Sequence, residues 1–210
     1  MTGEVTHNLR ADARENRDKI LEAARALFSE RGLDASMRDV ARDAGVGPAT
    51  LYRRFPTKQV LIDDVFADEL RACRGIVADG CADPDAWRGF SSVIEELCVL
   101  NVENTGFVDA FMSANPRAPV FAHHRAAVLR QLEELAARAQ RAGRLRRDFA
   151  IDDLVLVLLS CRGLSSIRPS IRAAAARRFA ALALDGLREN ATNAALPRKP
   201  DLVDEVLRTP

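Results

Sequence analysis

The sequence predicts an all-α protein, with a small three-helix domain at the N-terminus and a larger helical domain after it. Aromatic residues make up only 5% of the 210 residues, and Ala, Leu and Val dominate the apolar runs, which favours helices over strands. Apolar residues recur at helical spacing along most of the chain, and Gly or Pro ends several of these runs. A hydrophobic content of 48% supports a packed core and excludes the disordered and collagen-like classes.

The first apolar run predicts a helix over residues 16–32. Ile20 and Leu27 belong to a set of apolar residues at helical spacing, and Gly32 stands where a helix commonly stops. Residues 1–14 show no such period, so we expect a flexible arm there.

Two short helices are predicted next, joined by a glycine turn. Ser36 stands three residues before Asp39, which is the spacing of a capping box, and the apolar face that follows stops at Gly45. Pro48 suits the first position of a new helix, which we expect to run to Phe55. A short helix, a turn and a second short helix form a helix-turn-helix motif, here over residues 36–55.

Longer helices are predicted in the remainder of the chain. Thr57 suits the cap of a long fourth helix that reaches about residue 79, and a loop follows at 80–84. The further helices are expected at about 85–103, 107–114, 120–142, 152–164 and 170–189. The tail carries one short apolar set that either docks or stays free: Leu202, Val203, Val206 and Leu207.

The charge of the chain permits only a local basic surface. The sequence holds 31 basic and 30 acidic residues, a net charge of +1. Between Ser36 and Lys58, however, five basic residues stand against two acidic ones. The polar side of the third helix also carries Thr50, Tyr52, Arg53 and Arg54. Hydroxyl and guanidinium groups bond phosphates and base edges, so this side predicts contact with DNA, although taken singly its arginines also fit an ordinary solvated face.

Two segments of the sequence resemble the TetR family of transcriptional regulators. They are ILEAARALFSERG in the first helix and GVGPATLYRRFPTKQVL from the glycine turn onward, and the resemblance covers about residues 16–62. It implies a homodimeric regulator, usually a repressor, that binds double-stranded DNA at a palindromic operator. It also implies that the larger domain dimerises and binds a small-molecule effector, which on our hypothesis tilts the fourth helix and changes the spacing of the recognition helices. Whether the chain represses or activates transcription stays open.

The resemblance also assigns roles within the helix-turn-helix motif. It places Pro48, Ala49 and Tyr52 at the major groove, Arg38 within reach of a base or a phosphate, and Thr50, Arg54 and Lys58 on the DNA backbone. Arg38 is the side chain that we expect to make a specific contact, because a guanidinium bonds guanine bidentately. The full set is Arg38, Gly47, Pro48, Ala49, Thr50, Tyr52, Arg53, Arg54 and Lys58.

The motif departs from the family pattern at two places. Gly47, Pro48 and Ala49 lack the polar side chains of many relatives, and Arg53 and Arg54 replace the more usual aromatic residue or His. These departures favour recognition through thymine methyl groups, DNA shape and the arginines.

The larger domain supplies two further predicted sites. Bulky apolar residues with one polar group are expected to line the effector site, although core packing is the alternative for the aromatic ones: Phe90, Leu97, Asn101, Phe107, Phe111 and Met112. Apolar faces of the last two long helices are expected to pair with those of a second copy: Leu154, Val155, Leu158, Leu159, Phe179 and Leu182. The corresponding domains are an arm at 1–14, the DNA-binding domain at 15–62, the effector and dimerisation domain at 63–190, and a tail at 191–210.

Other functional classes lack support in the sequence. We find no phosphate-binding glycine loop and no spaced catalytic set, so no enzyme and no cofactor is expected. No metal site is expected either, because the adjacent His123 and His124 point about 100° apart on a helix and the four cysteines form no CxxC pair. No apolar run approaches the ~20 residues that span a membrane, so we expect a soluble, cytoplasmic protein. A helical adaptor that does not bind DNA is the competing reading.

Overall fold

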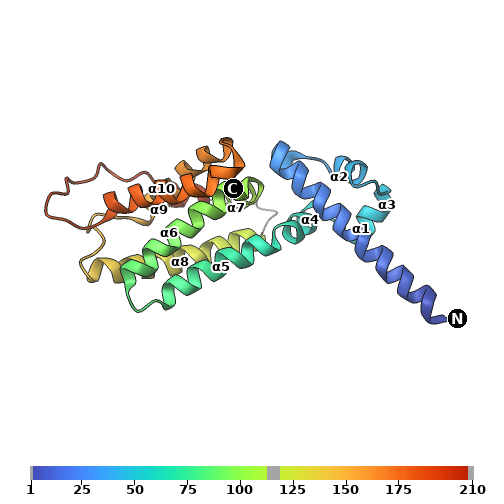
Figure 1. Ribbon diagram of the computed structural model, residues 1–210, viewed down its shortest axis with the longest axis horizontal. Helices are drawn as coiled ribbons and strands as arrows, with labels where there is room; N and C mark the ends of the chain where they lie inside the picture. Colours follow the sequence, from blue (N-terminus) through green and yellow to red (C-terminus); the bar gives the residue numbers. More distant parts are fainter. Residues whose placement is uncertain (1, 113–118, 208–210) are drawn as a thin grey trace. The chain divides into compact units, whose positions relative to one another are not determined.

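The computed structural model describes residues 2–112 and 119–207, and the chain divides into two compact units. The first comprises Met1–Asp68 and the second Glu69–Pro210. Within the described residues the structure contains helices and no strand, and one isolated antiparallel bridge joins Leu145 to Arg188 (Figure 1). No described helix is long and apolar enough to cross a membrane.

The first unit is built from four α-helices and a short 3-10 turn. They are α1 (Thr2–Arg31), η1 (Gly32–Asp34), α2 (Met37–Asp43), α3 (Pro48–Arg54) and α4 (Lys58–Val65). Helix α1 extends back to Thr2, through the segment 1–14 that we predicted as a flexible arm. That segment has no Pro, and its Ala, Arg and Glu residues are good helix formers, so the helix propagates without an apolar face.

The predicted fourth helix is two helices in the structure. Helix α4 ends before Phe66, and α5 (Ala67–Ala82) begins directly after it. The guanidinium of Arg25 on α1 donates to the carbonyl of Val65 and lies 5.9 Å from the centre of the Phe66 ring. The Phe66 ring also packs 6.2 Å from Phe28. Because Phe66 is anchored against α1 in this way, the helix is interrupted at a residue where the sequence carries no Gly or Pro.

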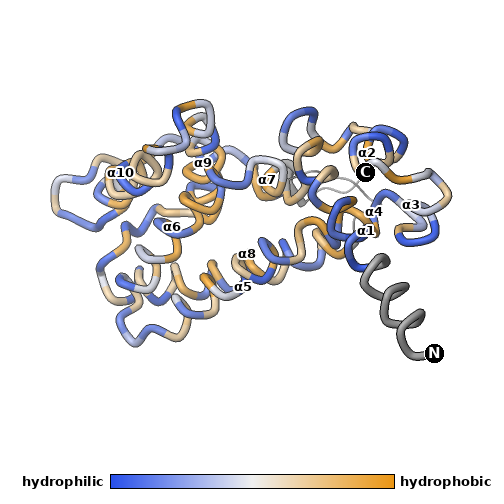
Figure 2. Tube along the Cα trace, turned by 45° about the vertical axis from the view of Figure 1, so that its right-hand side comes forward, coloured by the Kyte–Doolittle hydropathy of each residue, from blue (hydrophilic) through white to orange (hydrophobic). Residues whose placement is uncertain are grey.

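The second unit contains the longer helices. They are α5, α6 (Ala86–Glu103), α7 (Thr105–Met112), α8 (Pro119–Arg141), α9 (Ile151–Cys161), η2 (Arg162–Ser166), α10 (Pro169–Leu187) and α11 (Leu202–Leu207). Helix α6 lies at the centre of this unit and packs against α8, α9 and α10. The hydrophobic stretches of α6 and α9 lie beside one another in the interior (Figure 2).

The sequence placed the described boundaries of these helices within a few residues, with two differences, and the predicted end of the helix at 107–114 lies outside the described residues. Helix α9 ends at Cys161, and the 3-10 helix η2 follows it. The last residues of the predicted helix, 162–164, are therefore in 3-10 and not in α-helical conformation. The predicted loop at 80–84 begins later, because α5 continues to Ala82 and carries Gly80 inside the helix. A Cβ at Gly80 would lie 2.2 Å from Val93 and 2.9 Å from the Gly89 carbonyl oxygen, so this glycine allows α5 and α6 to approach closely.

The C-terminal tail docks on the second unit. The side chains of Leu202 and Val203 pack against Leu129 on α8 and Val155 on α9. The sequence left open whether the tail docks or stays free. In the structure it docks through these two residues. The side chains of Val206 and Leu207 lie outside the described part.

Candidate nucleic-acid interface and effector cavity

The turn between α2 and α3 is fixed by local chemistry. The Ser36 hydroxyl accepts from the Asp39 amide at 3.2 Å, and Asp39 accepts from the Ser36 amide at 3.3 Å, which forms the predicted capping box. The hydroxyl and the amide of Ser36 lower the pKa of Asp39, so the box contains a carboxylate at neutral pH. Gly45 adopts a φ of +66°, where an L side chain is strained.

Hydrogen bonds and buried side chains then set the angle of α3. The amide of Val46 donates to the Ala41 carbonyl at 3.0 Å, and the amide of Gly45 donates to the Arg42 carbonyl at 3.1 Å, which closes α2 in a Schellman motif. The apolar seam beneath the two helices is buried: Val40, Ala41, Leu51 and Phe55. These contacts set which side of α3 faces outward.

The outer side of the motif carries the predicted DNA-binding residues. Arg38, Arg53 and Arg54 are exposed, and the Tyr52 side chain is 50% exposed although it is aromatic. Thr50 and Lys58 are half-buried, and Gly47, Pro48 and Ala49 are exposed at the start of α3. The structure thus brings the predicted set together on one short stretch of the first unit.

The basic residues of this surface differ in their charge partners. Arg42 pairs with Asp39 and with Asp43, at 3.0 Å each, which neutralises it. In the described part of the chain, Arg38, Arg53, Arg54 and Lys58 form no such ion pair. Four cationic groups therefore remain to meet phosphates or base edges.

A groove beside α3 was not predicted from the sequence. It is about 150 Å³ in volume and is lined by Asn16, Arg17, Ile20, Thr50, Arg53 and Arg54. Arg17 is held by Asp64 of α4 at 3.0 Å. Because α1 and α3 are separated in the sequence, only tertiary packing brings Asn16 and Arg17 to the side of α3.

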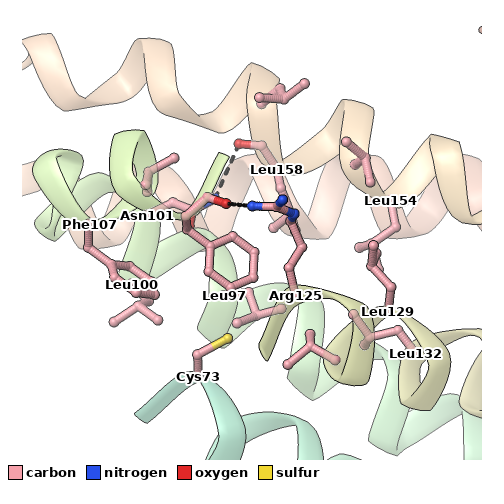
Figure 3. Close-up of a pocket in the computed structure, with 15 residues that line it drawn as sticks. Cys73, Leu97, Leu100, Asn101, Phe107, Arg125, Leu129, Leu132, Leu154 and Leu158 are labelled. Carbon is pink, nitrogen blue, oxygen red and sulfur yellow. Dashed lines mark hydrogen bonds between the residues drawn. The ribbon is translucent and has the colours of Figure 1, made fainter. Parts of the chain in front are cut away.

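A second candidate site is an apolar cavity in the second unit. Helices α5 to α9 supply its walls, and its free volume is about 60 Å³ (Figure 3). Four of the predicted effector residues line it: Leu97, Asn101, Phe107 and Phe111. Phe90 does not line it but packs in the core, edge-on to Phe149 at 5.5 Å, and the Met112 side chain lies outside the described residues.

Two polar side chains reach this cavity. The Asn101 side-chain amide donates to the Leu158 carbonyl at 3.3 Å, which ties α6 to α9 (Figure 3). The Arg125 side chain is 3% exposed and donates to the Phe111 carbonyl, and burial lowers the pKa of Arg125. Arg125 was not predicted, because a charged residue is ordinarily exposed and nothing in the sequence marks this one as lying on the inner side of α8.

Residues predicted for the dimer interface fall into two groups in the structure. Leu154 and Val155 are buried and line the cavity, so they offer almost no exposed area to a second chain. Leu158 and Leu159 also line the cavity but stay half-buried, as does Phe179, whereas Leu182 is 65% exposed. Because the apolar run of α9 is continuous, the sequence does not distinguish the buried face of this helix from its exposed face.

Of the histidine pair and the four cysteines, only Cys73 is among the described residues that line the cavity. His123 is exposed, and His124 is buried edge-on to Phe111 at 5.7 Å. Burial, with the charges of Arg74 and His123, lowers the pKa of His124 to about 4. Within the described residues no group of three His, Cys, Asp or Glu side chains is placed to hold a metal ion.

Comparison with known proteins agrees with both units. Residues 20–65 match the model of bacterial regulatory proteins of the tetR family. Residues 85–189, half of the chain, match the C-terminal domain of SbtR-like transcriptional regulators. The chain belongs to the TetR family of bacterial transcriptional regulators. Its α2–α3 motif is the DNA-binding helix-turn-helix of that family.

Individual relatives show how far the similarity extends. The transcriptional regulator UidR of Escherichia coli K12 is 36% identical over 63 residues, which is 30% of this chain and 32% of UidR. The regulator SAUSA300_2515 of Staphylococcus aureus is 46% identical over 54 residues, 25% of this chain and 29% of that protein. The chain therefore spans about a third of the length of the curated relatives that it matches.

Solved structures extend the likeness over the larger domain. The TetR regulator SCO0520 from Streptomyces coelicolor is 33% identical, with 83% of this chain and 99% of that chain covered and a TM-score of 0.51. The ketosteroid transcriptional regulator KstR2 of Mycobacterium tuberculosis is 22% identical, with 83% and 95% covered and a TM-score of 0.64. The second likeness concerns the fold alone.

Proposed function

We propose that this TetR-family regulator is a ligand-responsive homodimeric repressor that binds a palindromic operator. The observation that carries the proposal is the outer side of the α2–α3 motif. It presents Arg38, Tyr52, Arg53, Arg54 and Lys58 on a rigid scaffold, and the arginines and the lysine have no competing carboxylate in the described residues. Arg38 is proposed to read a base, and Lys58 to anchor a phosphate at the start of α4.

A second chain is required by the way such motifs read DNA. Two recognition helices about 34–36 Å apart meet successive major grooves, so two-fold symmetry in the protein corresponds to a palindrome in the operator. Helices α9 and α10 carry apolar side chains that are exposed in one chain: Leu156, Ile171 and Leu182. We propose that these residues, with Leu158, Leu159 and Phe179 at their margins, form the dimer interface in place of the buried Leu154 and Val155.

The cavity of the second unit is the proposed effector site. Its lining is apolar apart from Asn101 and Arg125, which suits an amphipathic molecule with an apolar body and a hydrogen-bonding group. An effector that binds one state of the protein better than the other is expected to change operator affinity by about 5–150-fold. Phe111→Ala is expected to alter that response, because Phe111 lines the cavity.

The proposal is tested by selecting genomic fragments with the purified chain and sedimenting the complex with the enriched duplex. We expect a palindrome and two chains per duplex. An enriched site without two-fold symmetry, or a 23 kDa monomer at micromolar concentration, contradicts the homodimer. Enrichment of no fragment contradicts DNA binding and favours the adaptor.

The sign of regulation needs a separate measurement. A reporter gene placed behind the enriched fragment is expected to be transcribed less when the chain is present. An increase in transcription would show that the chain is an activator.

A further inference from the structure

The C-terminal tail is tied to the second unit by a set of polar contacts, and we call residues 194–207 the C-terminal strap. The Asp152 side chain, buried in the first turn of α9, accepts from Lys199 Nζ at 2.7 Å and from the Val203 amide at 3.0 Å. Asp148 accepts from the Leu196 amide at 2.9 Å. These contacts hold both the extended part of the strap and the start of α11.

A buried arginine completes the attachment. Arg146 is 6% exposed and forms a two-bond pair with Asp148, at 2.6 and 3.0 Å. The same guanidinium donates to the Ala194 carbonyl at 2.7 Å, so it reaches the first residue of the strap. Three charged side chains of the second unit, Arg146, Asp148 and Asp152, thus bond a segment that lies beyond the residues matched by either family model, and Arg146 also donates to the Gly186 carbonyl of α10 at 3.2 Å.

The strap covers the outside of one cavity wall. Leu129 of α8 and Val155 of α9 line the cavity, and the same two residues pack against Leu202 and Val203 of α11. The wall at this place is therefore one side chain thick, with the cavity on one side and α11 on the other. Figure 3 shows Leu129 and Leu132 of α8 facing Leu154 and Leu158 of α9, all four among the residues that line the cavity.

The size of the cavity shows that a wall must move before a ligand enters. Its free volume of about 60 Å³ is far below the roughly 300–1,000 Å³ of ordinary ligand sites, and an engineered cavity that holds benzene measures about 150 Å³. Helix α6, on the other side, is packed against α10 in the core of the unit. The wall between α8 and α9 is backed instead by α11, a helix of six residues that the polar contacts of the strap hold in place.

We propose that the C-terminal strap gates the effector cavity: release of α11 from Leu129 and Val155 opens the wall between α8 and α9 and admits a ligand. The closed strap holds the cavity at its small volume, and the tether at Asp152 sets how often it opens. A ligand that enters replaces the apolar contacts of Leu202 and Val203, so its binding competes with strap closure. The proposal rests on the proposed function only in taking the cavity as the effector site.

Two cysteines provide a direct measure of this opening. Cys73 lines the cavity and points its sulfur toward it (Figure 3), and the side chain is buried. Cys98 is fully buried elsewhere, with the Cys161 thiol donating to its carbonyl at 3.6 Å. N-ethylmaleimide labelling of the full chain, followed at each cysteine by mass spectrometry, therefore separates opening of the cavity from unfolding of the unit.

The variants are chosen to release the strap with little change elsewhere. Leu202→Ser combined with Val203→Ser removes the apolar contacts, and Lys199→Ala removes one bond to Asp152 from a side chain that is 52% exposed. The matched controls are Leu196→Ser, at a side chain that is exposed, and Arg198→Ala, at the exposed neighbour of Lys199.

The gate predicts faster labelling at Cys73 alone. We expect an increase of about tenfold or more for the double variant and of about threefold for Lys199→Ala, with Cys98 unchanged within about twofold and both controls like wild type. Equal acceleration at Cys73 and Cys98 would overturn the gate, because the strap would then stabilise the whole unit. No acceleration at Cys73 would also overturn it, since the cavity would open elsewhere.

Two further points keep the test decisive. If circular dichroism shows that the double variant has lost its helices, Lys199→Ala decides alone. Labelling also proceeds without DNA, so a chain that bound no operator would still reveal the gate, and a chain with no gate could still bind its operator.

Discussion

In residues 1–68 most helix boundaries coincide with a residue whose chemistry explains them, whereas in residues 69–207 several depend on contacts between helices. The capping box at Ser36, the positive φ of Gly45 and the cap at Thr57 delimit the first unit from within the local sequence. In the second unit, Gly80 lies inside a helix because α6 approaches there, and no local signal separates the two faces of α9. The surface of the helix-turn-helix depends on local sequence and is therefore predictable from it. The cavity of the second unit depends on which helices pack together and is not.

The largest expected effect is the loss of the core of the first unit by Leu51→Ala. Leu51 has no exposed area, so truncation leaves a cavity and should cost about 2–5 kcal/mol of unfolding free energy. Hydrogen exchange with mass spectrometry should show lost protection confined to residues 1–68. Equal loss of protection in α6 and α10 would break the comparison, because the two units would then unfold as one.

The next effect concerns the DNA-binding surface. Arg38→Ala should weaken binding to the selected duplex by about 1–3 kcal/mol and relax the preference at one base pair, since a bidentate contact to a base is lost. Lys58→Ala should instead weaken all duplexes alike and reduce the slope of log affinity against log salt by about 1. Competition binding with single-base variants measures both, and identical behaviour of the two variants would refute the division into reading and anchoring.

The third effect is a dependence on pH that should appear in the second unit. The folded pKa of His124 is about 4, because burial first, then Arg74 and His123, disfavour its charged form. In the unfolded chain the pKa of His124 is about 6.5. Between pH 4 and pH 6.5 the unfolded state therefore binds more protons than the folded state. The unfolding free energy should then fall as pH is lowered from about 6.5 to 4, by roughly 1–3 kcal/mol.

The pH dependence can be followed by fluorescence of Trp87, the single tryptophan, during urea unfolding at pH 7 and at pH 4.5. His124→Phe should remove the change, and His123→Gln, at the exposed neighbour, should retain it. Residues 14–68 contain no histidine, so hydrogen exchange there should vary little over this range beyond its intrinsic pH dependence. A persistent change in the His124→Phe variant would assign the effect to another group.

The smallest expected effect is on stability, and it compares one glycine substitution in each unit. Gly45→Ala should cost about 1–2 kcal/mol because its φ is +66°. Gly75→Ala, in the interior of α5 with open space around the added methyl, should stabilise by about 0.5–1 kcal/mol. Thermal unfolding of both variants measures the pair, and a change of the same sign in both would show that the turn conformation is not what Gly45 supplies.

Much of the fold was predictable because its signals are local. Ser36, Gly45 and Pro48 define the helix-turn-helix by capping and by backbone conformation, and periodicity placed the long helices within a few residues. The break at Phe66 was not predictable, since it depends on Arg25 and Phe28, about 40 residues earlier in the chain.

The sites divide in the same way. The polar side of α3 follows from helix periodicity once the buried seam is known, so Tyr52 and the arginines could be named in advance. The cavity required knowledge of which helices meet, and this is why Arg125 was missed and Leu154 was placed at the dimer interface. The docking of Leu202 on α8 and α9 likewise depends on the buried carboxylate of Asp152 as a tertiary partner.

The central claim is that the surface of α2 and α3 binds one DNA sequence by charge and by base contacts. It is tested most directly by the affinity of the full chain for its selected duplex and for a scrambled duplex of equal length, each at about 50 and 200 mM salt. We predict that the selected duplex binds about 10³-fold more tightly or better, and that both affinities fall steeply as salt rises. Equal affinity for the two duplexes, or an affinity that does not change with salt, would contradict the account.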